Sequence, residues 1–174
     1  KYKYPLGILF VFLLAFFVTS QVQAAHPNVP YSTLSSPRLS LVAQCQAQGT
    51  LPDSTCTPGA IFAGVTASEV CTPGYSKSVR NVPTSVKNQV YASYGIMSHS
   101  PGEYEIDHYI PLELGGSNEV ANLWPEPASP VPGFHEKDKV ENYLHAQVCS
   151  GAMALDEAQH EISTNWVDVY KRIA

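Results

Sequence analysis

The chain has 174 residues, 44% of them hydrophobic, and a formal net charge of −5 at pH 7. We set aside an N-terminal export segment of 24 residues. The remaining 150 residues suffice for one domain with a hydrophobic core and are too few for two domains that each have a sizeable core. That removal leaves eight Lys and Arg against fifteen Asp and Glu, a formal charge of −7. Such a chain lacks the general basic surface that phosphate backbones favour, so any contact of that kind requires a local group of cations.

Residues 1–24 have the layout of a secretory signal peptide. Lys1 and Lys3 precede the apolar run Leu6–Val18, and Val22-Gln23-Ala24 places small or apolar residues before a cut. A membrane anchor is the alternative, but the apolar run is shorter than the ~20 residues that spanning requires. We therefore expect cleavage after Ala24 and a secreted or periplasmic product without a membrane attachment.

Residues 25–49 are rich in Pro, Ser and Gln, and we expect them to form an N-terminal arm or linker. One folded domain then covers residues 50–174. Its first part, up to Arg80, is predicted to be loop, because Pro-Gly turns recur at 56–59 and 71–74.

The cysteines are even in number, which favours disulfides in an exported chain. Four cysteines allow three pairings, and the sequence leaves all three open. A structural zinc site is the alternative, but no C-x-x-C pair is present. We therefore expect up to two disulfides among the candidates Cys45, Cys56, Cys71 and Cys149.

A β-hairpin is predicted in the middle of the domain. The run Tyr104–Ile110 alternates in the manner of a strand, and Pro111 removes a ladder donor and should end it. The Gly-Gly-Ser-Asn sequence at 115–118 is typical of a turn, and Asn122-Leu123-Trp124 suits a short returning strand.

Three helices are predicted from apolar side chains at helical spacing. One covers Val82–Tyr94 and packs under the hairpin, one follows the hairpin and stops near Gly151, and one covers Leu155–Ile173. The buried stripes of the last two are Val140, Tyr143, Leu144 and Val148, then Ala158, Ile162, Trp166 and Val169. The predicted fold class is therefore α+β, a strand-loop-strand-helix unit with additional helices before and after it.

Asp107 and His108 place a carboxylate and an imidazole side by side at the end of the first predicted strand. A neutral imidazole accepts protons near neutral pH, and a carboxylate is a hard ligand suited to Mg²⁺ or Mn²⁺. Hydrolysis of a phosphodiester needs both a proton acceptor for water and a cation for the developing charge. The pair supplies one group of each kind.

Asp107-His108, the Gly-Gly turn and Asn122-Leu123 resemble the ββα-metal core of the HNH (His-Me finger) endonucleases. The segments 71–80 and 137–151 extend the resemblance to a secreted bacterial branch of that family. It implies that Asp107 binds the metal and that His108 is the general base. It also implies that Asn122 belongs to the catalytic group by pinning the loop beneath the base.

The resemblance further implies a second metal ligand from a His or Asn near the following helix. His135 is the first choice and Asn142 the alternative. Mg²⁺ is the expected cofactor, with Mn²⁺ or another transition metal as alternatives, and DNA is favoured over RNA as the substrate. The candidate nucleic-acid contacts are Lys77, Arg80 and Lys137, and the lack of a separate recognition domain predicts little sequence specificity.

Two other functions fit parts of the sequence. A cell-wall glycoside hydrolase would use paired carboxylates among Glu103, Glu105 and Glu113, but only two Trp residues are present to line a long substrate cleft. A secreted, non-catalytic binding module on an HNH-like frame is the other alternative. A zinc protease is rejected, because neither His135-Glu136 nor His160-Glu161 is completed by the second His of that motif.

Overall fold

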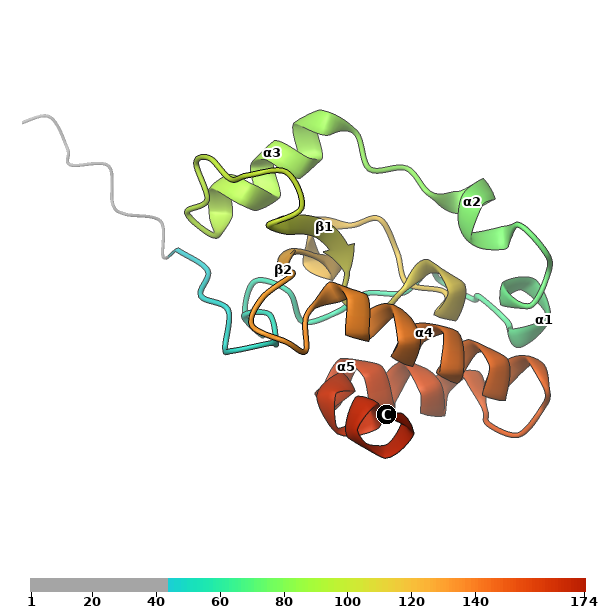
Figure 1. Cartoon of the computed structure of the whole chain (residues 1–174). Coiled ribbons are helices and arrows are strands. Elements are labelled where there is room, and N and C mark those ends of the chain that lie inside the picture. The colour runs from blue at the N-terminus through green and yellow to red at the C-terminus, as the bar shows by residue number, and fades with distance from the viewer. Residues whose placement is uncertain (1–43) are drawn as a thin grey trace, which may run out of the picture. The chain divides into compact units, whose positions relative to one another are not determined.

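The structure is a computed structural model that describes residues 44–174. The predicted signal peptide and most of the predicted arm lie outside the described residues. The fold is α+β, as predicted (Figure 1). Its helices and strands are, in chain order, α1 (Ala67–Val70), α2 (Tyr75–Val79), α3 (Thr84–Ser93), β1 (Tyr104–His108), the 3₁₀ turns η1 (Leu112–Leu114) and η2 (Val120–Asn122), β2 (Leu123–Pro127), α4 (Phe134–Cys149) and α5 (Leu155–Ile173).

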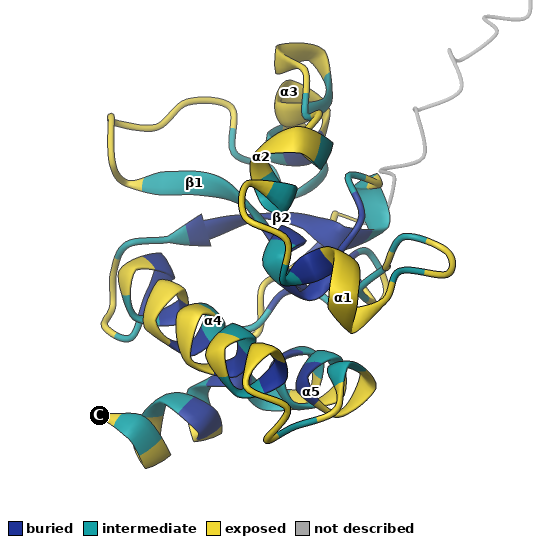
Figure 2. Ribbon diagram, turned by 90° about the vertical axis from the view of Figure 1, so that its right-hand side faces the viewer, coloured by how far each residue is buried: buried dark blue, intermediate teal, exposed yellow. Residues whose placement is uncertain are grey.

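The two strands form the predicted antiparallel hairpin, with Asp107 opposite Trp124 and His108 opposite Leu123. Figure 2 shows β2 buried along most of its length, whereas β1 is half-buried until its last residue. β1 ends at His108, earlier than the predicted end at Ile110, because the Ile110 N–H donates to the Asn122 side chain and not to a strand. Asp107 and His108 therefore lie at the end of the hairpin, where the pairing of the two strands stops.

The core lies where α4 and α5 pack side by side below the hairpin (Figure 1). α5 has the predicted bounds but is kinked at Asn165, whose φ of −162° and ψ of 84° are not helical. Both helices bury one stripe. Each fully buried aliphatic side chain contributes about 1.5–3 kcal/mol. Tyr143 lies at the edge of the α4 stripe and is exposed, contrary to its predicted place in the core. The buried stripe residues are Val140, Leu144, Val148, Ala158, Ile162, Trp166 and Val169.

Two short helices interrupt the segment that was predicted to be loop. α1 begins at a capping box in which Thr66 and Glu69 bond each other's backbone N–H groups. The T-x-x-E pattern at 66–69 is the sequence signal of this helix start, and the prediction of a loop overlooked it. α2 follows Gly74, whose φ of 83° lies in the left-handed region that favours glycine.

α3 begins at Thr84 and ends at Ser93, inside the predicted range. Gly95 follows with a φ of 73°, as expected for a residue that terminates a helix. α3 packs on both strands, across the hairpin from α4 in Figure 1. α3 therefore holds the hairpin from one side, and α4 is tied to β1 through the Lys137–Asp107 ion pair.

Two disulfides staple the domain, Cys45–Cys56 and Cys71–Cys149. The first closes a short loop next to the start of the described chain. The second spans 78 positions and joins the end of α1 to the end of α4. Loop-closure entropy predicts that the longer bridge stabilises more, by about 4–5 kcal/mol against about 3 kcal/mol. No helix among residues 44–174 is long and apolar enough to cross a membrane.

Candidate active site

His108 is held in one orientation by Asn118. The imidazole is 2% exposed, and its Nε2 lies 3.1 Å from Asn118 Oδ1. Asn118 is itself fixed, because its Oδ1 accepts from the Asn81 N–H and its Nδ2 donates to Val79 O. Since that oxygen only accepts, Nε2 must carry the proton and donate it. Neutral His108 therefore keeps the free lone pair on Nδ1.

The pKa of His108 lies below its ordinary value. Burial disfavours the charged imidazolium and outweighs the hydrogen bond to Asn118 and the nearby charge of Asp107, which both favour it. The ring is therefore neutral at pH 7, the state in which an imidazole accepts a proton.

A cavity of about 40 Å³ opens beside His108, which is room for about one water molecule or ion. A larger hollow of about 470 Å³ next to Met97 shares no lining residue with it and contains no carboxylate. The small cavity is lined from α2 and its C-terminus, from the end of β1 with the loop after it, and from α4. Its lining residues are Ser76, Arg80, Asp107, His108, Pro111, Leu112, Glu113 and Glu141.

Asn122 holds the loop between the two strands from beneath. The residue is 0% exposed, and its side chain makes hydrogen bonds only with backbone groups. Nδ2 donates to Ile110 O and Ser117 O, and Oδ1 accepts from the N–H groups of Ile110 and Ala60. It does not line the cavity, so Asn122 is a positioning residue for the loop that follows His108.

Replacing Asn122 with Ala should lower the free energy of unfolding by about 3 kcal/mol or more. The change leaves several buried backbone groups without partners, each at a cost of about 1–3 kcal/mol. Denaturant unfolding measures the loss. The matched control is Asn118→Ala, which removes an amide from the half-buried end of the same loop and should cost less. An Asn122→Ala variant within about 1 kcal/mol of wild type contradicts this role.

Lys137 points into the protein and forms a buried ion pair. It is 1% exposed, and its Nζ lies 2.6 Å from Asp107 Oδ2 and 2.9 Å from His108 O. A second ion pair joins it to Glu141, one helical turn further along α4. Burial lowers the pKa of Lys137, but the charges of Asp107 and Glu141 outweigh this and hold it well above its ordinary value. Burial also opposes ionisation of Asp107, and the Lys137 charge nevertheless keeps the Asp107 pKa below its usual value.

Glu113, Glu126 and Glu141 are among the carboxyl groups near this pair whose pKa values are raised. Burial, followed by the charge of Asp107, raises the pKa of Glu126 well above its ordinary value. Glu126 is 1% exposed, and neither carboxylate oxygen has a hydrogen-bond partner among the described residues. Burial also raises the pKa of Glu113 and brings that of Glu141 to about 8.

The raised pKa of Glu141 predicts that stability falls between about pH 5 and pH 8. The folded chain keeps this proton up to about pH 8, whereas the unfolded chain releases it near its ordinary pKa of 4.5. The folded state binds more protons in that window, so the free energy of unfolding decreases as pH rises. The decrease should be roughly 2–4 kcal/mol, since a tenfold difference in a proton-binding constant corresponds to about 1.4 kcal/mol.

Denaturant unfolding across that pH range, in chelator, measures the slope. Glu141→Gln should make it shallower, with the remainder due to Glu113 and Glu126, whose pKa values burial also raises. Replacing the exposed Glu119 by Gln should leave it unchanged. A slope that Glu141→Gln does not alter, or stability that rises with pH, contradicts the assignment.

The structure brings together only some of the predicted site residues. Asp107, His108 and Arg80 line one cavity, whereas His135 and Asn142 are exposed on α4 and do not line it. Lys77 is exposed on α2. The prediction that Lys137 contacts nucleic acid is wrong, because its ammonium is buried against Asp107.

Sequence reasoning missed the roles of Asn118, Glu126 and Glu141. The spacing of Lys137 and Glu141 was a readable signal, because residues four apart on a helix are neighbours. Of the carboxylates considered for a glycosidase, only Glu113 lines the cavity.

Asp107, Glu113 and Glu141 match a hard divalent cation in donor type. Their spacing is not that of a preassembled site, because among residues 44–174 only Cys71, His145 and Cys149 bring three ligand atoms within 4.8 Å of one another. Comparison of the chain with known protein families, with curated proteins and with solved structures finds no match.

Proposed function

We propose that this chain is an exported, metal-dependent endonuclease that hydrolyses phosphodiester bonds of nucleic acid with little sequence specificity. The order β1, loop, β2, α4 supports a ββα centre of the HNH type. The observation that carries the proposal is the fixed, neutral His108, which has its lone pair on Nδ1 and lies beside a small cavity lined by carboxylates and one arginine.

His108 accepts the proton of the attacking water at Nδ1. Asn118 keeps the other ring nitrogen protonated throughout, so the tautomer needs no rearrangement before the reaction. Asn122 acts indirectly, because it holds the loop that continues from His108. Arg80 provides a cation at the cavity that suits a phosphate oxygen.

Asp107 would hold the divalent metal, with Glu113 or Glu141 as further oxygen ligands from the same cavity. Mg²⁺ is the favoured ion, because the donors are carboxylates and no thiolate or exposed imidazole lines the cavity. The metal would stabilise the negative charge that develops on the phosphate and its leaving oxygen.

The acidic balance of the chain is compatible with this substrate if the contact is local. Arg80 at the cavity and Lys77 on α2 provide two exposed cations on the same short segment. The buried Lys137 adds a further positive charge beneath Asp107. Export is supported by the N-terminal sequence pattern and by two disulfides, which persist in oxidising compartments.

A panel of substrates tests the proposal. Purified protein is incubated with plasmid DNA, structured RNA and cell-wall glycan in Mg²⁺ and in Mn²⁺. We expect cleavage of nucleic acid, with DNA cut faster than RNA, and no release of sugar. Degradation of the glycan supports a carboxylate-based glycosidase, and a chain that cuts nothing supports a binding module; either result overturns the proposal.

A further inference from the structure

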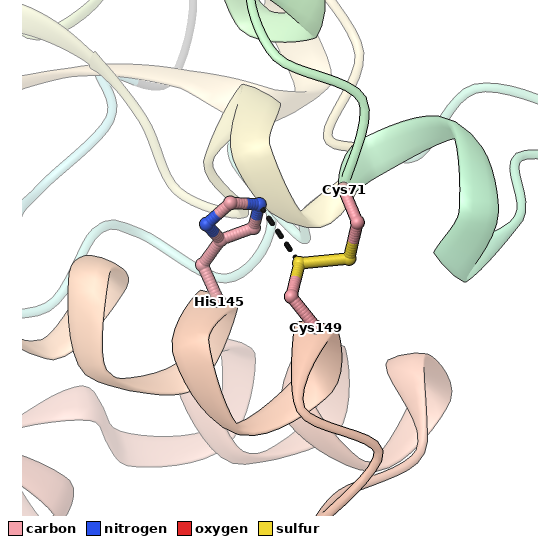
Figure 3. Close-up of side chains that lie close together, drawn as sticks. All are labelled: Cys71, His145 and Cys149. Carbon is pink, nitrogen blue, oxygen red and sulfur yellow. Dashed lines mark hydrogen bonds between the residues drawn. A yellow bond between two sulfur atoms is a disulfide. The ribbon is translucent and has the colours of Figure 1, made fainter.

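A second group of metal-binding side chains lies where α1 and α4 end. Figure 3 shows the Cys71–Cys149 disulfide with the imidazole of His145 directed at it. His145 Nε2 lies 3.3 Å from Cys149 Sγ and 3.0 Å from Val70 O. None of these side chains lines the cavity beside His108. We propose that, once this disulfide is reduced, Cys71, Cys149 and His145 bind Zn²⁺ or a similar borderline transition-metal dication.

The nitrogen and sulfur atoms are already spaced as zinc requires. With Zn–S near 2.3 Å and Zn–N near 2.0–2.1 Å, two ligands on a tetrahedral ion lie about 3.5 Å apart for a sulfur and a nitrogen, and about 3.8 Å for two sulfurs. The observed distance from His145 Nε2 to Cys149 Sγ is 3.3 Å. All three ligand atoms lie within 4.8 Å of one another, so the main movement required is separation of the two sulfurs, from bonding distance to about 3.8 Å.

The backbone at both cysteines can accommodate that separation. Cys71 caps α1, a helix of only four residues, and Cys149 is the last residue of α4, before an exposed turn. His145 lies one helical turn before Cys149, so the two ligands from α4 share a face. Three protein ligands leave the fourth zinc position open to water.

An added phosphine serves as the reductant of the Cys71–Cys149 disulfide. Two electrons from phosphorus break the S–S bond, water provides the oxygen of the phosphine oxide, and each sulfur becomes a thiol. Zinc then displaces one proton from each thiol, and both protons pass to solvent. Nε2 now donates to Val70 O, so zinc binding also moves the imidazole proton to Nδ1 and leaves that carbonyl without this donor.

The metal would preserve the link between α1 and α4 that the disulfide provides. Without either, the segment 71–80, which brings Ser76 and Arg80 to the cavity, loses its covalent tie to α4. The zinc site is independent of the proposed endonuclease activity, and its test requires no nucleic acid.

The test uses the full chain with Cys45→Ser and Cys56→Ser, so that Cys71 and Cys149 are the only thiols. After phosphine reduction and removal of excess metal, bound zinc is measured by elemental analysis, and Co²⁺ is added as a spectroscopic probe. We expect about one zinc per reduced chain, none at this site in the oxidised chain, and a thiolate-to-cobalt charge-transfer band.

Two variants test the ligands. His145→Ala should weaken zinc binding by more than the roughly 10–100-fold that loss of an outer-shell partner costs, whereas His160→Ala, at an exposed position of α5, should not change it. Cys149→Ser should abolish the charge-transfer intensity from that sulfur. Circular dichroism checks that each protein is folded before loading. A folded, reduced chain that takes up no zinc, or that binds it equally well without His145, overturns the proposal.

Discussion

Replacing His108 with Ala should lower the rate of phosphodiester cleavage by about 10²–10⁴-fold, the usual contribution of a general base. His108 is the neutral imidazole whose Nε2 proton is committed to Asn118, which leaves Nδ1 to accept a proton. Initial rates of plasmid cleavage at saturating Mg²⁺ measure the loss. His108→Gln retains the bulk of the buried side chain and should be equally slow, so a packing defect can be distinguished from loss of the base.

The matched control is His135→Ala. His135 was the first sequence-based choice for a metal ligand, but it is exposed on α4 and does not line the cavity. Its replacement should leave the rate within about threefold of wild type, a difference below about 0.7 kcal/mol. If His135→Ala is as slow as His108→Ala, His135 takes part in the reaction and the cavity carboxylates are not the full set of metal ligands. If a folded His108→Ala cuts at the wild-type rate, His108 is not the base.

Replacing Lys137 with Met should lower the free energy of unfolding by about 3–5 kcal/mol, as expected when one partner of a buried ion pair is removed. The ammonium is the positive charge in contact with both Asp107 and Glu141. Without it, Asp107 stays buried beside Glu126 and Glu141 with no counter-charge, and protonation becomes the remaining route to neutrality. Urea unfolding at pH 7 measures the loss.

Lys139→Met is the control on the same helix. Lys139 is exposed, and its ion pair with Glu136 is a surface contact at 3.4 Å, which contributes about 0–1 kcal/mol. Equal effects of Lys137→Met and Lys139→Met would show that the buried cluster is not the source of stability.

The sequence predicts those parts of the fold that repeat a simple pattern. Ala158, Ile162, Trp166 and Val169 recur at helical spacing, and the structure buries all four. They lie on a helix with the predicted bounds, but the sequence pattern did not predict its kink at Asn165. The hairpin is predicted in its order and partly in its bounds, because alternation identifies a strand better than it identifies the residue at which pairing stops. The fold class follows from these elements.

The buried contacts between charged side chains in the candidate site could not be predicted, because they depend on the directions in which those side chains point. A lysine near the start of a helix is usually solvated. The spacing of Lys137 and Glu141 indicates a contact between those two residues, but it does not indicate that Lys137 is buried against Asp107. Glu126 lies between two prolines in a short strand, where a carboxylate would ordinarily mark an exposed edge. Asn118 lies ten positions after His108, and the two side chains meet only because the folded loop brings them together.

The proposed function requires this chain to hydrolyse phosphodiester bonds with the help of a divalent metal. The most direct measurement is the initial rate of plasmid cleavage by the purified wild-type protein in Mg²⁺, then in excess chelator, then with Mg²⁺ restored. We expect cleavage, its loss in chelator and its recovery with the metal. Plasmid that stays intact in every divalent metal tried, or cleavage that chelator does not affect, would contradict the claim.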